Sequence, residues 1–319
     1  MRSSGSGRPM LAALLLLALI GVGVLGVPEF TSSGNLTSLL KLIGLYGIFS
    51  LGAGLVILTG GIDLSIGALL SLLGVSLAIL LRDLAVAPAV AVAVVLSIAA
   101  LAGLAHGILV ARLRLQPFLV TLCGLLVYRS LARWIANDES KGFGTSSGFE
   151  GLRDIATGSL VGVPAPFVAF VVVAIAYHVI VHRTRFGRHV VAVGANEAAA
   201  AYAGIRTQRV LVLTYVLAAT TTGIAAIGIA FYTNSMQPSS HGNFYELYGI
   251  AAAVLGGASL RGGEGTVLGI ALGTAVILLI QNLVNLLGIP SAWNLGVLGG
   301  VILFAIVVEA SLARRRGID

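Results

Sequence analysis

The chain has 319 residues, of which 58% are hydrophobic and only 10% are charged, and its mean hydropathy is +1.04. Soluble domains carry about 25% charged residues, so this composition excludes an ordinary soluble enzyme or a disordered chain. The formal net charge of +7 comes from few charges on a very apolar chain, and it therefore indicates no nucleic-acid partner. The single cysteine, Cys123, can form no internal disulfide and predicts no metal site. We expect an integral membrane protein.

Ten apolar segments approach the length of about 20 residues that a membrane helix needs. In chain order they are 10–27, 36–59, 64–81, 85–110, 117–135, 164–181, 210–231, 247–260, 266–287 and 293–312. The eighth is short for a full crossing. Because lipid cannot satisfy exposed backbone groups, and because these segments are too long for barrel strands, we predict an all-α polytopic bundle. The whole chain, 1–319, is predicted to form this single transmembrane domain.

The basic residues predict the orientation of the bundle, since Lys and Arg gather in cytoplasmic loops. Most of the 19 Lys and Arg lie on one side if both termini are cytoplasmic. The first apolar run is longer than the 7–15 residues of a signal-peptide core, so we predict an uncleaved first helix. The longest loops are 137–163 on the outer side and 182–209 on the cytoplasmic side.

The first informative motif is Thr59-Gly-Gly-Ile-Asp-Leu-Ser-Ile-Gly67. Gly60 and Gly61 release the backbone after the second span, and Asp63 then lies where an N-cap is needed, with acceptors facing the amides of Ser65 or Ile66. One interpretation is a plain helix cap at a cytoplasmic turn. The other is a discontinuous helix that brings a polar group to a transport path.

A related Gly-Gly motif occurs at Gly256-Gly-Ala-Ser-Leu260 and continues into a glycine-rich turn at 261–265. Both motifs are predicted to end a span on the same face. A phosphate-binding P-loop requires Gly-Lys-Ser/Thr, and the sequence contains no Gly-Lys dipeptide. The motif therefore predicts a tight turn between helices rather than a nucleotide site.

The loop 182–209 contains a short predicted helix. Asn196 is a suitable N-cap, Glu197 suits the first turn, Ala198 and Ala199 favour helix, and Gly204 can end it. Such a helix is either a surface connector or a docking element for a soluble partner, because small side chains permit close approach.

Polar groups within spans are costly and mark candidate functional positions. These groups are Thr121, Gln281, Asn282, Asn285, Trp293, Asn294, His106 and His178, and Glu246 lies at the predicted outer start of the eighth span. Single amides more often join helices than bind ligands. The sequence contains no set of buried acids and bases typical of a proton relay and no nucleophile–base motif of a hydrolase.

At these motifs the sequence resembles the permease subunits of ABC importers for monosaccharides, of the ribose, xylose, arabinose and galactose type. The resemblance lies in residues 59–67, in Gln116-Pro-Phe-Leu-Val-Thr-Leu122, in 183–205 and in 245–265, and it extends over roughly 36–312. Tyr248 and Ala258 depart from the family pattern, which usually has Asp and Thr or Ser there.

The resemblance implies a ten-helix permease that hydrolyses nothing itself. Its partners would be a second permease chain, a cytoplasmic subunit that binds ATP and Mg²⁺, and an external sugar-binding protein. The chain would need no cofactor and would lie in the bacterial plasma membrane. The implied coupling residues are Asn196, Glu197, Ala198, Ala199 and Gly204. The candidate path or gate residues are Gly60, Gly61, Asp63, Ser65, Thr121, Gln281, Asn282 and Asn285.

Two other classes stay open. An ion-gradient-driven secondary transporter of a small polar solute would need no ATPase, and a structural or signalling membrane subunit would transport nothing. The sequence does not name the sugar.

Overall fold

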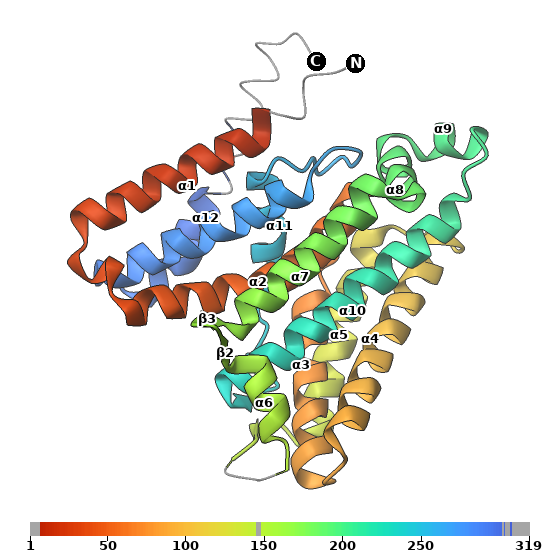
Figure 1. Ribbon diagram of the computed structural model, residues 1–319. Coiled ribbons are helices and arrows are strands. Elements are labelled where there is room, and N and C mark those ends of the chain that lie inside the picture. Colours follow the sequence, from red (N-terminus) through yellow and green to blue (C-terminus); the bar gives the residue numbers. More distant parts are fainter. Residues whose placement is uncertain (1–6, 145–147, 302, 304–306, 308–319) are drawn as a thin grey trace.

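The computed structural model describes residues 7–144, 148–301, 303 and 307 (Figure 1). Apart from two pairs of two-residue strands, the regular structure of these residues is helical. Eight of the described helices are long and apolar enough to cross a membrane. The prediction of an all-α polytopic bundle is confirmed.

The eight membrane-length helices follow the predicted spans closely. They are α1 (Gly7–Gly26), α2 (Ser33–Leu58), α3 (Ile66–Ala78) with its π-helical extension η2 (Ile79–Asp83), α4 (Pro88–Ala111), α5 (Pro117–Ile135), α7 (Ala165–His178) with its π-helical extension η3 (Val179–Arg183), α10 (Thr207–Thr233) and α12 (Val267–Leu286). α5 has the predicted bounds because Pro117 suits a first helical turn.

The remaining elements are short. They are η1 (Pro28–Thr31), α6 (Glu150–Thr157), α8 (Arg185–Ala195), α9 (Glu197–Tyr202), α11 (Tyr245–Leu255) and η4 (Ser291–Trp293). Strand β1 (Lys141–Gly142) pairs with β4 (Ser235–Met236), and β2 (Ser159–Leu160) pairs with β3 (Val163–Pro164), both antiparallel. The predicted loop 137–163 thus holds α6 and parts of both strand pairs.

The predicted count of ten spans is tested only in part. The eighth segment, 247–260, forms α11, whose 11 residues rise about 16 Å and cannot cross 30 Å of hydrocarbon alone. The tenth, 293–312, falls partly on residues outside the described ones. Ten spans and two cytoplasmic termini therefore stay predictions.

The bundle has an interior layer and a periphery. The apolar windows of α2, α3 and α10 are 72%, 72% and 67% buried, whereas that of α1 is only 11% buried. The peripheral helices expose apolar side chains such as Leu17 and Leu101, as a surface facing lipid requires. Gly269 and Gly273 of α12 form a Gly-x-x-x-Gly motif and pack directly against backbone atoms of Gly256 and Ala252, so α11 and α12 cross closely there.

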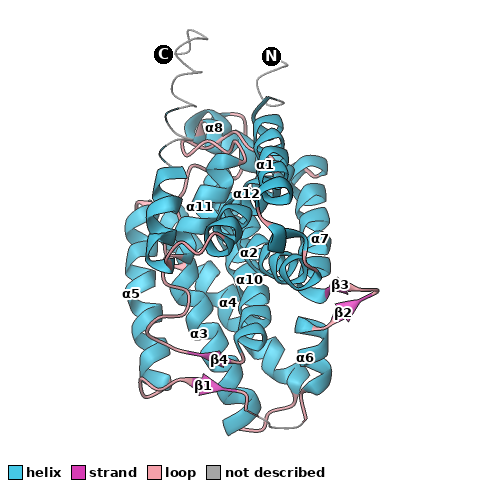
Figure 2. Cartoon of the chain, turned by 90° about the vertical axis from the view of Figure 1, so that its left-hand side faces the viewer, coloured by secondary structure: helices cyan, strands magenta, loops and turns pink. Residues whose placement is uncertain are grey.

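The two ends of the bundle carry different elements. α8 lies at one end, and α6 and the β1–β4 pair lie at the other (Figure 2). We call them the α8–α9 end and the β1–β4 end. Two segments that join long helices to the next helix, 59–65 and 235–244, are not helical.

Candidate functional site

The turn at 59–65 joins α2 to α3 and has no regular secondary structure. The predicted N-cap position of Asp63 is wrong, because α3 begins only at Ile66 and Ser65 occupies its N-cap. The predicted hydrogen bond to the Ser65 amide is nevertheless confirmed, since Asp63 Oδ1 accepts from the Ser65 backbone N–H (2.8 Å) and also from the Ser65 hydroxyl (2.6 Å). The carboxylate thus closes the turn that precedes the helix, which is a typical role for Asp. The backbone between α2 and α3 is non-helical, as both interpretations required, and the place of this turn on a transport path stays a prediction.

Side chains from α5 and α10 enclose this turn. The Thr121 hydroxyl lies 3.0 Å from the Ile62 carbonyl oxygen and 2.9 Å from that of Pro117. A Cβ placed on Gly61 would lie 2.9 Å from the Tyr215 hydroxyl. Asp63 and Ser65 are buried, with 5% and 0% of their surfaces exposed. The structure therefore brings together Gly61, Asp63, Ser65 and Thr121, while Gly60 lies exposed at the start of the turn.

Three aromatic residues, His106, Tyr128 and Tyr215, lie close to one another beside this turn. The Tyr128 hydroxyl and His106 Nε2 are 3.1 Å apart, and the His106 ring meets the Tyr215 ring edge to face. The Tyr215 hydroxyl is buried and makes no hydrogen bond within the described residues. His106 was a sequence candidate, whereas Tyr128 and Tyr215 were missed because single tyrosines within apolar spans resemble ordinary core residues. We call Asp63, Ser65, His106, Thr121, Tyr128 and Tyr215 the polar centre.

The α12 amides predicted for the path make their contacts elsewhere. Gln281 Nε2 donates to the Tyr248 hydroxyl of α11 (2.6 Å). Asn282 forms a reciprocal amide pair with Asn35, in which Asn282 Nδ2 donates to Asn35 Oδ1 (2.6 Å) and Asn35 Nδ2 donates back (3.2 Å). Asn285 is exposed. The predicted path residues thus form two groups, one at the α2–α3 turn and one on α12.

A second irregular segment, 235–244, follows α3 back into the bundle before α11 begins. Met236 packs against Gly74, the Ser71 hydroxyl donates to the Pro238 carbonyl (3.3 Å), and Gly242 packs against Gly67. Gly67 and Gly74, which mark the two ends of these contacts, lie seven residues apart on α3, or about 10 Å along its axis. α11 therefore starts inside the bundle, which explains why the eighth apolar segment is short.

Charged groups accompany this second segment. Arg129 Nη1 donates to the carbonyl oxygens of Pro238 (2.8 Å) and His241 (2.7 Å). Glu246, in the first turn of α11, is buried, and its Oε2 lies 2.6 Å from an ideal Cβ on Gly67. Glu246 thus lies at the start of the eighth apolar segment, as predicted, and it contacts the first turn of α3; its outer position stays a prediction.

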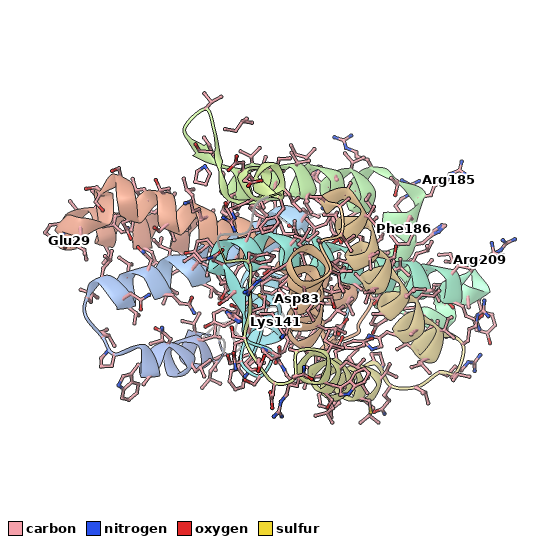
Figure 3. All side chains as sticks on the ribbon, turned by 90° about the horizontal axis from the view of Figure 1, so that it is seen from below. Glu29, Asp83, Lys141, Arg185, Phe186 and Arg209 are labelled. Atoms are coloured by element: carbon pink, nitrogen blue, oxygen red, sulfur yellow. The ribbon has the colours of Figure 1, made fainter. Side chains whose placement is uncertain are left out.

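The predicted helix in the loop 182–209 is confirmed as α9. The Asn196 side chain caps it by accepting from the Ala199 backbone N–H at 2.9 Å, and Gly204 follows its C-terminal end. Glu197, Ala198 and Ala199 are exposed. Arg185 of α8 and Arg209 of α10, the helices that precede and follow α9 along the chain, project outward on the same side of the molecule (Figure 3).

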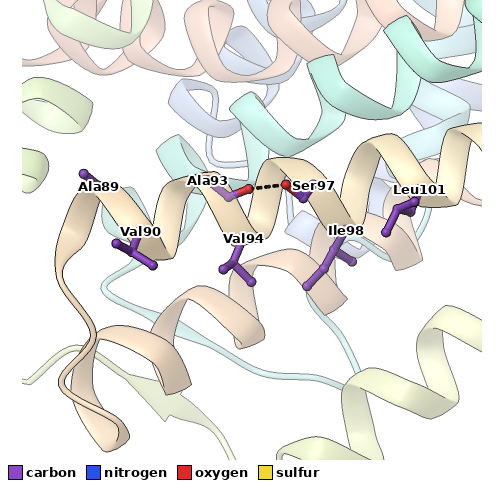
Figure 4. Close-up of a pocket in the computed structure, with 7 residues that line it drawn as sticks. All are labelled: Ala89, Val90, Ala93, Val94, Ser97, Ile98 and Leu101. Carbon is purple, nitrogen blue, oxygen red and sulfur yellow. Dashed lines mark hydrogen bonds between the residues drawn. The ribbon is translucent and has the colours of Figure 1, made fainter.

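Two surface hollows differ in chemistry. One of about 440 Å³ follows the outer face of α4 and is lined by apolar side chains from Ala89 to Leu101; its only hydroxyl, that of Ser97, is bonded back to the Ala93 carbonyl (Figure 4). Another of about 370 Å³ lies at the β1–β4 end of α5, beside Trp134 and the Arg133–Asp138 ion pair. The first suits hydrocarbon rather than a polar solute. No group of three His, Cys, Asp or Glu that could hold a metal ion occurs among the described residues.

Eight helices of membrane length, two irregular segments and a buried polar centre define a polytopic membrane protein. Residues 35–306 match the family described as branched-chain amino acid transport system / permease component. The chain belongs to this family of transport permeases, and it is a multi-pass protein of the bacterial inner membrane.

Named relatives cover nearly the whole chain. It is 36% identical over 296 residues to the ribose import permease protein RbsC of Bacillus subtilis (strain 168), covering 92% of this chain and 90% of the relative. It is 35% identical over 302 residues to RbsC of Escherichia coli (strain K12), covering 95% and 92%. It is 31% identical over 315 residues to the fructose import permease protein FrcC of Rhizobium meliloti, covering 97% and 86%. No solved structure matches the chain.

Proposed function

We propose that the chain is the membrane-spanning permease subunit of an ATP-driven, binding-protein-dependent importer of a monosaccharide. The observation that carries this proposal is the similarity, over more than nine tenths of the chain, to ribose and fructose import permeases. The family description names branched-chain amino acids instead, which makes an amino-acid importer the second candidate. The sugar importer is favoured because the named sugar permeases align almost from end to end.

The proposed partners bind at the two ends of the bundle. α9 is the coupling helix, and Asn196, Glu197, Ala198, Ala199 and Gly204 form the surface that meets a cytoplasmic ATPase, which binds ATP and Mg²⁺. Its exposed small side chains support this role because they allow close approach. An external sugar-binding protein delivers the substrate at the β1–β4 end. A second permease chain, identical or related, completes the pore.

The translocation path is proposed to run beside the polar centre and the start of α11. Irregular backbone is tolerated at membrane depth only where protein buries it or where it lines a cavity, and such breaks mark the binding region of many transporters. Gly61, Asp63, Ser65 and Thr121 shape the α2–α3 turn on this path. On α12, Gln281 is connected to α11 through Tyr248, which places it next to the same region.

The mechanism is alternating access with the free energy supplied by the partner. ATP binding closes the ATPase subunits, the docked α9 helices move, and the paired permeases change between outward-open and inward-open states. Specificity resides mainly in the binding protein, so the path itself holds the sugar weakly. The modest number of polar side chains on the path is consistent with weak binding.

The test is uptake by proteoliposomes that contain the permease, the ATPase and the binding protein encoded beside it. We expect uptake of radiolabelled ribose or fructose only when ATP and the binding protein are both present. Uptake of leucine instead would support the amino-acid candidate. Uptake driven by an ion gradient without ATP would identify a secondary transporter, and the absence of any uptake, despite binding of a soluble partner, would indicate a structural subunit.

A further inference from the structure

Three segments from distant parts of the sequence meet through backbone atoms at the α8–α9 end. They are the end of α2, the end of α8 and the glycine-rich turn between α11 and α12. The Gly263 N–H donates to the Leu58 carbonyl oxygen at 2.9 Å, which joins the first and third segments. Gly194 of α8 packs against the same carbonyl, and a Cβ on Gly194 would lie 2.6 Å from Gly263 N.

The other contacts of this meeting point are equally close. A Cβ on Gly262 would lie 2.6 Å from Gly60 N and 2.8 Å from the Gly194 carbonyl oxygen. A Cβ on Gly263 would lie 2.7 Å from Cα of Ala195, and its φ of +77° also disfavours other residues. No side chain fits between the three backbones. We call Leu58, Gly60, Gly194, Gly262 and Gly263 the glycine junction.

The connections of the glycine junction run in two directions. On one side, only Ala195 and the cap residue Asn196 separate Gly194 from α9. On the other side, Leu58 begins the turn that leads to Asp63, and Gly263 lies between the end of α11 and the start of α12. The junction is thus the place where the end of α8, which leads directly into α9, contacts the chain segments on both sides of the polar centre and α11.

Contacts made by backbone alone have no side-chain rotamers that could absorb a displacement. Tightly packed interfaces change between discrete arrangements rather than deforming continuously. A shift of α8 toward the junction therefore pushes on the end of α2 and on the 261–265 turn, which the Gly263–Leu58 hydrogen bond holds together.

We propose that the glycine junction transmits the movement of α9 to the α2–α3 turn and to α11. This inference rests on the proposed function, because it requires an ATPase docked on α9. Gly194 and Gly263 are positioning residues: they contact no substrate, and they act through the turns that they hold.

The experiment compares Gly194→Ala and Gly263→Ala with two matched controls in the reconstituted complex of permease, ATPase and binding protein. Gly34→Ala adds the same methyl group in α2 where nothing lies within 4 Å. Gly288→Ala matches the backbone strain of Gly263→Ala, since its φ is +70° and nothing lies within 4 Å. The readouts are co-purification of the ATPase, ATP hydrolysis and sugar uptake per ATP hydrolysed.

We expect both junction variants to retain the ATPase and its hydrolysis while uptake per ATP falls about 2- to 30-fold, the range found for residues that couple distant sites. The controls should stay at the wild-type ratio. Junction variants that keep the wild-type ratio would overturn the proposal. A wild-type complex that takes up no sugar would instead refute the proposed function.

A second measurement covers the case in which Gly194→Ala does not fold. Thr59→Cys, in a chain whose native cysteine is replaced by Cys123→Ala, reports on the α2–α3 turn without altering a junction glycine. We expect the rate of maleimide labelling at residue 59 to change when vanadate traps nucleotide in the ATPase. An unchanged rate would show that the turn does not respond to α9, which overturns the proposal.

Discussion

The Asp63–Ser65 turn yields a quantitative prediction about the α2–α3 connection. Asp63 Oδ1 accepts two hydrogen bonds from Ser65, which is fully buried. Asp63→Ala removes the acceptor and leaves two buried donors, each costing about 1–3 kcal/mol, so the free energy of unfolding should fall by about 2–6 kcal/mol. Asp63→Asn keeps an acceptor oxygen but loses the charge-assisted strength of the bonds, and it should cost only about 1 kcal/mol.

The assay is the midpoint of heat-induced loss of monodisperse protein in detergent, measured with uptake in proteoliposomes. Ser65→Ala removes only the hydroxyl donor and should cost about 0.5–1.5 kcal/mol. The double variant Asp63→Ala/Ser65→Ala should cost less than the sum of its parts, because both changes affect one hydrogen bond. If Asp63→Asn is as damaging as Asp63→Ala to both stability and uptake, the negative charge, and not the acceptor, is what the turn requires.

Three further predictions concern other parts of the chain. Asn282→Ala breaks the pair with Asn35 and should lower stability by about 0.6–1.7 kcal/mol; a loss of uptake beyond the loss of folded protein would place Asn282 on the path. Asn196→Ala removes the cap of α9, at about 1 kcal/mol of helix stability, and should lower uptake per ATP, which Asn196→Ser should restore. Arg133 holds the pKa of Asp138 below its usual range, chiefly by a hydrogen bond. The ion pair therefore contributes stability above the ordinary carboxyl pKa and loses it as the pH falls through the lowered value, so Asp138→Asn and wild type should differ in thermal midpoint at pH 7 and converge in strong acid.

The helical crossings were predictable because hydropathy and proline placement are local properties. Pro117 begins α5, and the cap at Asn196 begins α9, as the sequence indicates. The irregular segment at 235–244 was not predictable, because its conformation depends on contacts with Gly67 and Gly74 of α3, which are far away in the sequence. A window of hydropathy contains no information about such contacts.

The site was predictable at its turn and not around it. Two glycines followed by an acid signalled a backbone break, and the structure places Gly61 and Asp63 in that break. Tyr128 and Tyr215 reach the polar centre only through the packing of α5 and α10. The contacts of the α12 amides were not predictable either, because Asn282 pairs with Asn35 of α2, which is distant in the sequence. Their role on the path stays a prediction.

The positions of the internal polar groups follow from the cost of unsatisfied backbone in a membrane. Each irregular segment leaves carbonyls and amides that a helix would pair internally. In the segment 59–65, the Ile62 carbonyl lies within hydrogen-bonding distance of the Thr121 hydroxyl. In the segment 235–244, the Pro238 and His241 carbonyls accept hydrogen bonds from Arg129. Both side chains belong to α5, eight residues or about 12 Å apart along its axis. α5 therefore holds both irregular segments, and a change in its tilt acts on the α2–α3 turn and on the segment that leads into α11 together.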